Sequence, residues 1–207
     1  MLTLTDLAIS RGGRRLIQGV NLHLRSGELA VLSGPNGSGK TSLLRTIAGL
    51  QLPAEGRIEM AEDTAIFAGH QDAIKAQLSV AENLTFWAAI HGQAATQVDK
   101  AVSAFNLGDL STRLAANLSA GQKRRLGLAR LIVARRDLWI LDEPTVSLDK
   151  NSVAMFDAAL SAHLAAGGAA IIATHIDLNH KATVVNMQEF TAQNSDADDP
   201  FLAGALS

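Results

Sequence analysis

The sequence lacks cysteine and tyrosine altogether, and it contains no long apolar run. Without cysteine, disulfide bonds and thiolate metal sites are both excluded. A membrane helix needs about 20 apolar residues, whereas the best candidate, 126–134, is short and contains Arg130. The first residues also lack the basic stretch and apolar run of a secretory signal. We therefore expect a soluble, cytoplasmic chain, so any transport pathway that it serves would belong to another polypeptide.

The sequence also lacks a marked excess of charge of either sign. The net charge is -2 over 207 residues, so no basic field indicates nucleic acid as a partner. Hydrophobic residues make up 47% and charged residues 18%, a balance that supports a substantial core. The length suits a single domain, 1–207. At its end, 191–207 is rich in aspartate and poor in residues that could pack, so we expect a disordered tail.

Short apolar runs alternate with helix-like segments, which is the pattern of an α/β fold with a largely parallel sheet. The start of the chain differs, because 2–24 alternates in two-residue steps around a turn at Gly12 and Gly13. This alternation predicts antiparallel strands with one solvated face. The later runs predict buried strands, and they comprise 29–32, 65–67, 138–141 and 169–173.

A helical lobe is predicted within this core. Ser79 and Glu82 form a capping-box pattern, and Thr96 with Asp99 resembles one, so we expect a helix to begin at each. We place the helical lobe at 72–135. The α/β core, with its N-terminal antiparallel strands, then comprises 1–71 and 136–190.

A glycine-rich segment follows the first buried run. It fits the P-loop pattern G-x-x-x-x-G-K-[ST] and stands between a strand and a helix, as that pattern requires. The glycines let consecutive N–H groups point at an anion, and the helix adds its positive N-terminal end. Lys40 can reach the β- and γ-phosphates, and the Thr41 hydroxyl can take one Mg²⁺ position. The predicted phosphate site comprises Gly34, Pro35, Asn36, Gly37, Ser38, Gly39, Lys40, Thr41 and Ser42.

Two acidic residues follow the buried run at 138–141. Asp142 emerges where a parallel sheet presents its ligands, and it would hold Mg²⁺ through the water shell of the ion. Glu143 is the next residue, so its side chain points in a different direction from that of Asp142. It can polarise a water molecule for attack on the γ-phosphate. An acidic helix cap is the other interpretation of this pair, but the P-loop favours catalysis. ATP and Mg²⁺ are therefore the predicted cofactors, with Glu143 and Lys40 as catalytic residues.

The segment from Leu118 to Gln122 reads Leu-Ser-Ala-Gly-Gln and resembles the ABC signature, usually Leu-Ser-Gly-Gly-Gln. Ser119 is a good helix N-cap, and Gly121 lets the backbone approach a ligand. The segment lies upstream of the acidic pair, as in ABC ATPases, and no Asn-Lys-x-Asp guanine-reading motif is present. The chain thus resembles an ABC transporter ATP-binding subunit. This resemblance implies a P-loop NTPase fold with a RecA-like parallel-sheet core, an antiparallel β subdomain and an inserted helical subdomain.

The resemblance covers roughly 1–180 and implies partners. Two subunits would face each other head to tail as a homodimer, each ATP lying between the P-loop of one copy and Ser119, Gly121 and Gln122 of the other. A second helix N-terminus would then face the γ-phosphate. Integral membrane subunits would complete the transporter. The chain would accordingly lie on the cytoplasmic face of the inner membrane as a peripheral subunit.

Several single residues also match the ABC pattern or depart from it. Asp149 lies in a segment that resembles the D-loop of the dimer interface, and His175 resembles the switch histidine that contacts the γ-phosphate. Arg11 stands where an aromatic ring usually stacks on adenine, and its planar guanidinium can stack instead. His70 and Gln71 both compete for the position of the glutamine that senses Mg²⁺: spacing favours His70, and side-chain chemistry favours Gln71.

Five segments of the chain together resemble one branch of the ABC family, and they comprise 69–71, 82–87, 91–92, 118–131 and 138–144. In these segments the chain is most similar to the ATPase subunit of the haem exporter of cytochrome c maturation. That resemblance implies that ATP hydrolysis powers haem export or releases a haem-loaded chaperone. Three alternatives stay open: another small bacterial exporter for lipids or peptides, a non-transport ABC ATPase, and a nucleotide-binding regulatory module without turnover.

Overall fold

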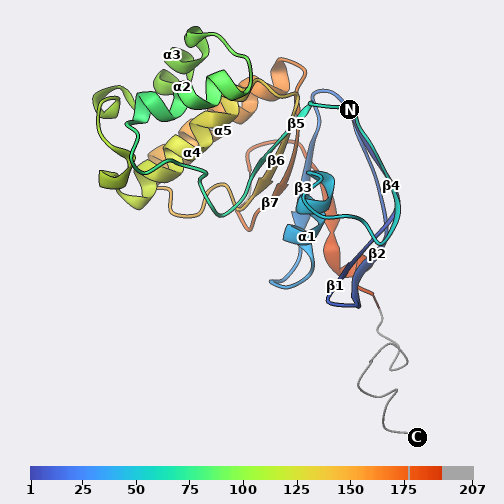
Figure 1. Cartoon of the computed structure of the whole chain (residues 1–207). Helices are drawn as coiled ribbons and strands as arrows, with labels where there is room; N and C mark the ends of the chain where they lie inside the picture. Colours follow the sequence, from blue (N-terminus) through green and yellow to red (C-terminus); the bar gives the residue numbers. More distant parts are fainter. Residues whose placement is uncertain (177, 193–207) are drawn as a thin grey trace, which may run out of the picture.

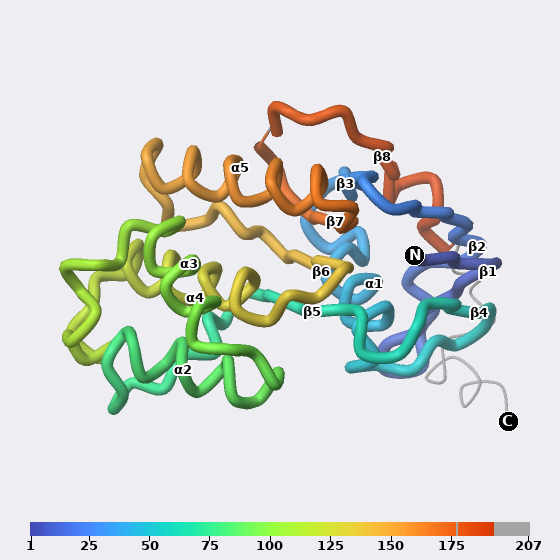
Figure 2. Tube along the Cα trace, turned by 90° about the horizontal axis from the view of Figure 1, so that it is seen from above, coloured from blue at the N-terminus to red at the C-terminus, as the bar shows by residue number. Residues whose placement is uncertain are grey.

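The computed structural model describes residues 1–176 and 178–192. In this part of the chain two β-sheets combine with a group of helices (Figure 1). Seen from above, the antiparallel sheet stands at one end and the helical lobe at the other, with the parallel sheet between them (Figure 2). The predicted α/β architecture is confirmed.

The parallel sheet has the order β5 (Ala65–Ala68), β6 (Leu138–Asp142), β7 (Ala169–Ala173), β3 (Leu29–Ser33) and β8 (Thr183–Asn186). Every residue of β6 and β7 is buried, as expected of strands that are covered on both faces. Because all five strands run the same way, their carboxyl ends meet at one edge of the sheet. Ligands bind at that edge in open α/β sheets.

The antiparallel sheet has the order β2 (Arg14–Leu24), β1 (Leu2–Arg11) and β4 (Glu55–Glu59). Leu2, Leu4 and Leu7 of β1 are buried, which confirms the inward-facing half of the alternation expected from the sequence. The β1–β2 hairpin turns at Gly12 and Gly13, where φ is 58° and 79°.

Five α-helices lie in the described part of the chain. Helix α1 (Lys40–Ile47) follows the P-loop, and α5 (Lys150–Ala165) connects β6 to β7. The helical lobe contains α2 (Val80–Ile90), α3 (Ala95–Ala104) and α4 (Ala120–Ala134). Short 3₁₀ turns occupy Gly108–Leu110, Ala115–Asn117 and Met187–Phe190. None of the helices in residues 1–176 and 178–192 has the length and apolar character needed to cross a membrane.

Neighbouring residues of the parallel strands face two different cores. In β6, Trp139 and Leu141 pack with α5 and with the helical lobe, including its helix α4. Leu138 and Ile140 of the same strand pack with α1 and the antiparallel sheet. The parallel sheet therefore lies between the two cores. It holds the helical lobe and the antiparallel sheet in place relative to the P-loop.

The structure differs from the sequence prediction at three places. Helix α3 begins at Ala95 with Ala94 as its N-cap, so the capping box expected at Thr96 is wrong. Strands β4 and β8 were not predicted, because both are short and neither is a pure apolar run. Thr191 forms a β-bridge with Ile17, so ordered structure extends past the start of the expected tail, and 193–207 lies outside the described residues.

Candidate nucleotide-binding site

The P-loop joins β3 to α1 through three glycines in left-handed conformations. Gly34, Gly37 and Gly39 have φ of 136°, 84° and 94°, which side chains rarely adopt. Space is limiting as well, because a Cβ on Gly39 would lie 2.9 Å from Ile17 Cγ2. A Cβ on Gly34 would lie 3.0 Å from Ser38 Oγ. The loop can therefore keep this tight curve only with glycine at these positions.

Lys40 is the first residue of α1 and is only 8% exposed. Its Nζ donates to the carbonyl oxygens of Gly34 (2.6 Å) and Pro35 (3.0 Å), which uses two of its three N–H donors. The Ser38 hydroxyl is buried and has no hydrogen-bond partner among the described residues. An unpaired buried hydroxyl is costly, and a phosphate oxygen would satisfy it. Residues 34–42, including Thr41 and Ser42, thus suit an anionic ligand.

Asp142 ends β6 with its carboxylate buried. Its Oδ2 has no hydrogen-bond partner in residues 1–176 and 178–192, an arrangement that costs free energy unless a cation lies nearby. The residue therefore fits a role in holding Mg²⁺. No group of three or more His, Asp or Glu side chains in the described chain could bind a metal alone. The remaining ligands would be Thr41, phosphate oxygens and water, the set that Mg²⁺ commonly uses.

Glu143 has a positive φ of 50°, which is uncommon for a residue other than glycine. Its amide donates to the Ala173 carbonyl of β7 at 2.8 Å, and its Oε1 lies 3.3 Å from His175 Nε2. The same His175 nitrogen lies 3.3 Å from Asn36 Oδ1 in the P-loop. The fold thus brings together three residues that are far apart in the sequence: a carboxylate, an imidazole and a P-loop amide.

The structure favours His70 over Gln71 as the residue that faces the acidic pair. His70 Nε2 lies 3.6 Å from Asp142 Oδ2, although the imidazole is largely exposed. Gln71 follows as an exposed residue. This placement supports the spacing argument, and the identity of the residue that senses Mg²⁺ stays a prediction.

The signature segment forms the start of α4. Ser119 is its N-cap: Ser119 Oγ accepts from the Gln122 amide at 3.3 Å, and Gln122 Oε1 accepts from the Ser119 amide at 2.9 Å. The Gln122 side chain thus stabilises its own helix terminus. A Cβ on Gly121 would lie 3.2 Å from the Ser147 carbonyl, so the segment that resembles the D-loop packs closely on this turn.

Asp149 has a local role that the sequence prediction missed. Its carboxylate caps α5 by accepting from the Ser152 amide at 2.7 Å. This hydrogen bond lowers the pKa of Asp149. The signal was present in the sequence, because an aspartate directly before a helix pattern is typical of an N-cap.

Arg11 is the last residue of β1 and is exposed at the tip of the β1–β2 hairpin. The hairpin tip and the P-loop lie toward the same end of the molecule (Figure 1). The hairpin also reaches the loop directly, because Ile17 of β2 packs against Gly39. This placement is compatible with a contact between Arg11 and the base of a nucleotide.

One residue with extensive contacts near the site was missed entirely. Arg124, one turn into α4, is buried and donates to the carbonyls of Gly69, Glu143 and Pro144 and to the carboxylate of Asp72. Arg124 lies in the segment 118–131 that carries the family resemblance, but the sequence prediction gave it no role.

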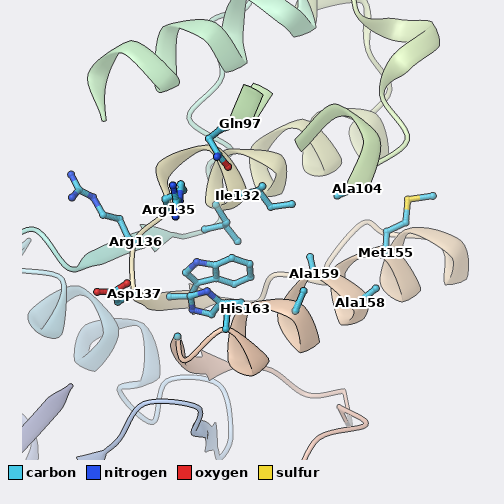
Figure 3. A pocket seen from close by; sticks show the side chains of 15 residues that line it. Gln97, Ala104, Ile132, Arg135, Arg136, Asp137, Met155, Ala158, Ala159 and His163 are labelled. Carbon is cyan, nitrogen blue, oxygen red and sulfur yellow. The ribbon is translucent and has the colours of Figure 1, made fainter. Parts of the chain in front are cut away.

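A separate cavity of about 470 Å³ lies between α3, α4, α5 and β6. Figure 3 shows Arg135, Arg136 and Asp137 at one end of it and Met155 near the other. His163 lines this cavity and stacks on Trp139 with ring centroids 4.0 Å apart. None of the residues predicted for the nucleotide site lines it.

Comparison with known proteins agrees with this geometry. A family model described as "ABC transporter" matches residues 17–146. The chain is 56% identical over 199 residues to the cytochrome c biogenesis ATP-binding export protein CcmA of Ruegeria pomeroyi, covering 96% of this chain and 97% of that protein. It is 59% identical to the protein of the same name from Roseobacter denitrificans, over 84% of this chain and 83% of the other.

A solved structure shows the same fold at lower identity. It is the dimeric ATP-binding cassette MJ0796 in a post-hydrolysis state with ADP and phosphate, with a TM-score of 0.74 and 21% identity, covering 85% of this chain and 88% of that one. The family is established by the relatives and by the family model rather than by this likeness. The chain belongs to the ABC transporter family, and within it to the cytochrome c biogenesis ATP-binding export proteins.

Proposed function

We propose that this chain binds ATP with Mg²⁺ between two copies of itself, and that ATP hydrolysis powers a membrane complex of cytochrome c maturation that exports haem or releases a haem-loaded chaperone. The observation that carries the hydrolytic part is the convergence of Glu143, His175 and Asn36 beside the P-loop. The name of the relatives supports the link to cytochrome c biogenesis and export.

Binding of the triphosphate rests on the P-loop. Its backbone amides, the N-terminal end of α1 and Lys40 supply positive potential at one place. When ATP binds, Lys40 exchanges a carbonyl partner for phosphate oxygens, a stronger and charge-assisted interaction. Thr41 and Asp142 would hold Mg²⁺, which neutralises charge on the β- and γ-phosphates.

Hydrolysis rests on Glu143 as general base. Its carboxylate is mostly shielded from solvent, and His175 lies within reach of one of its oxygens. Glu143 would accept a proton from the attacking water. His175 would orient the Glu143 carboxylate, and Asn36 would orient the P-loop side of the pocket, where the phosphates bind. His70, beside Asp142, would sense whether the cation and γ-phosphate are present.

The family resemblance supports a site shared by two copies. Ser119 and Gly121 lie at the start of α4 in the helical lobe, whereas the P-loop belongs to the α/β core. A second copy would bring its α4 N-terminus to the γ-phosphate, and Asp149 would lie at the interface. Integral membrane subunits would dock on the cytoplasmic side, and the exposed segment 70–78 is our candidate contact.

Phosphate release by the purified chain tests the hydrolytic role. Replacing Glu143 by glutamine should slow hydrolysis about 10²- to 10⁴-fold, the range for a lost general base, while leaving ATP affinity within a factor of a few. Turnover at the normal rate in Glu143→Gln would remove this residue from the mechanism.

Complementation tests the link to haem. In a bacterium that lacks its own version of this subunit, wild-type chain should restore covalently haem-bearing c-type cytochromes, measured by haem staining of periplasmic proteins. The Glu143→Gln variant, expressed at the same level, should not. Restoration by the wild-type chain and by Glu143→Gln alike would mean that cytochrome maturation does not need ATP hydrolysis by this chain. Restoration by neither would favour another exported substrate.

A further inference from the structure

The buried guanidinium of Arg124 connects three parts of the molecule. Nε donates to Pro144 O (3.0 Å), and Nη2 donates to Glu143 O (2.7 Å). Nη1 donates to Gly69 O (2.9 Å) and to Asp72 Oδ1 (2.8 Å). The side chain is 7% exposed, so these bonds are shielded from water and geometrically fixed.

These bonds constrain the backbone of Glu143 from both sides. Its amide is held by Ala173 of β7, and its carbonyl is held by Arg124 of α4. A left-handed conformation in a non-glycine residue persists only where its surroundings over-determine it. The pair of bonds does so here, and the direction of the Glu143 side chain toward His175 follows from that backbone.

The same guanidinium holds the segment around His70. Gly69 precedes His70 and Asp72 follows it closely, and both accept from Nη1. Gly127, one turn along α4, adds to this attachment, because a Cβ there would lie 2.8 Å from Asp72 Cβ. The absence of a side chain at Gly127 is thus what lets the segment lie directly on α4.

We propose that Arg124 is a positioning residue that ties Glu143 and the His70 segment to the helix that begins at Ser119, so that contact of Ser119 with an ATP bound to a second copy sets the catalytic geometry of its own copy. The inference rests on the proposed ATP hydrolysis. Ser119 and Arg124 stand on one helix just over a turn apart, and a helix transmits such a displacement as a rigid element.

The test compares two adjacent arginines. Arg124→Met combined with Asp72→Asn removes both charges of the ion pair, which avoids leaving one charge buried alone. Arg125→Lys is the matched control, because Arg125 Nη1 donates to the carbonyls of Phe105 and Asn106, within the helical lobe, and lysine keeps the positive charge that helps to lower the pKa of Asp149. For each full-length variant, kcat and KM of ATP hydrolysis and the dissociation constant for ATP are measured.

We expect kcat to fall about 10- to 100-fold in the double variant, the scale for misplaced catalytic groups, with KM and the dissociation constant within about 3-fold of wild type. A general loss of folding would instead lower the number of ATP sites per chain and leave kcat per site unchanged. Arg125→Lys should keep the wild-type kcat per site.

Arg124→Lys covers the case in which the double variant fails to fold. Lysine keeps the charge beside Asp72 but lacks the planar fork that reaches three carbonyls, so kcat should still fall while the melting temperature stays near that of wild type. A wild-type kcat in Arg124→Lys or in the folded double variant would overturn the proposal. Absence of hydrolysis in wild-type chain would instead overturn the proposed function.

Discussion

At the scale of single residues, the site holds strain in Glu143 and leaves a buried oxygen of Asp142 and of Ser38 without a hydrogen bond within the described residues. A left-handed conformation costs a non-glycine residue about 1–2 kcal/mol, and Glu143 has a φ of 50°. The buried oxygens of Asp142 and Ser38 have no hydrogen-bond partners in the described chain. The free-energy cost of both features is tolerated where a bound ligand offsets it. This agrees with a site that is completed by a phosphate and a cation.

Arg11 gives a prediction about the base. If its guanidinium stacks on adenine, Arg11→Ala should weaken ATP binding by about 1 kcal/mol, or roughly 5-fold, as for an exposed cation–π contact. Affinity for inorganic triphosphate should not change, because the phosphates bind at the P-loop. Titration calorimetry with both ligands measures the two effects. Equal ATP affinity before and after the substitution would mean that Arg11 is only a surface charge.

His163 gives a prediction about pH. Burial, as the main cause, lowers the pKa of His163 in the folded chain, and it also lowers that of His91. The unfolded chain, with histidine near pKa 6.5, therefore binds more protons than the folded chain as the pH falls through that value. Stability should be fully present above about pH 7.5 and should decline as the pH falls through about 6.5 toward the lowered pKa.

Replacement of His163 by phenylalanine isolates this effect. The ring would still stack on Trp139, but it cannot titrate. The urea midpoint should then fall less steeply between pH 7.5 and 5.5 than in wild type, with a remaining slope from groups such as His91. An unchanged slope in His163→Phe would assign the pH dependence elsewhere.

At the scale of elements, two glycines test how tightly β4 is held on β1. A Cβ on Gly56 would lie 2.5 Å from the Thr5 carbonyl oxygen and closer still to that of Asp6. Gly49, after α1, has a similar positive φ but no atom within 4 Å of the same position. Gly49→Ala should therefore cost only the conformational penalty, about 1–2 kcal/mol. Gly56→Ala should cost clearly more in chemical denaturation, and equal losses would contradict this packing.

The sequence predicted those parts of the site that depend on local patterns. The P-loop is local, because its glycines and Lys40 lie within one short loop and the start of α1. Asp142 was predicted because a continuous apolar run fixes where a buried strand ends. The capping box at Ser79 and the N-cap at Ser119 were also predicted, since each closes within three residues.

The remaining parts depend on contacts that join distant segments. His70 lies near Asp142 because β5 and β6 are neighbours in the sheet, and no local pattern shows this. The partners of Arg124 come from three segments, and a basic run gives no sign of them. Strand β8 pairs beside β3 although it is short and partly polar, so its position comes from the sheet and not from its own pattern.

At the scale of the whole molecule, the phosphate cradle and the signature helix lie in different parts of one chain. The P-loop belongs to the core, and Ser119 begins a helix of the lobe (Figure 1). In the account proposed here, ATP joins the two across a pair of copies, and hydrolysis of one phosphate bond releases them. Arg124 then couples each lobe to its own catalytic residues.

The molar mass of the Glu143→Gln chain, measured by light scattering with and without ATP and Mg²⁺, tests this account most directly. Slow hydrolysis should preserve the ATP-bound form, so the mass should double when ATP is added, with one ATP per chain. Adding Lys40→Ala should abolish the change, because the triphosphate loses its main cation. A mass that stays the same with saturating ATP bound would contradict the shared site.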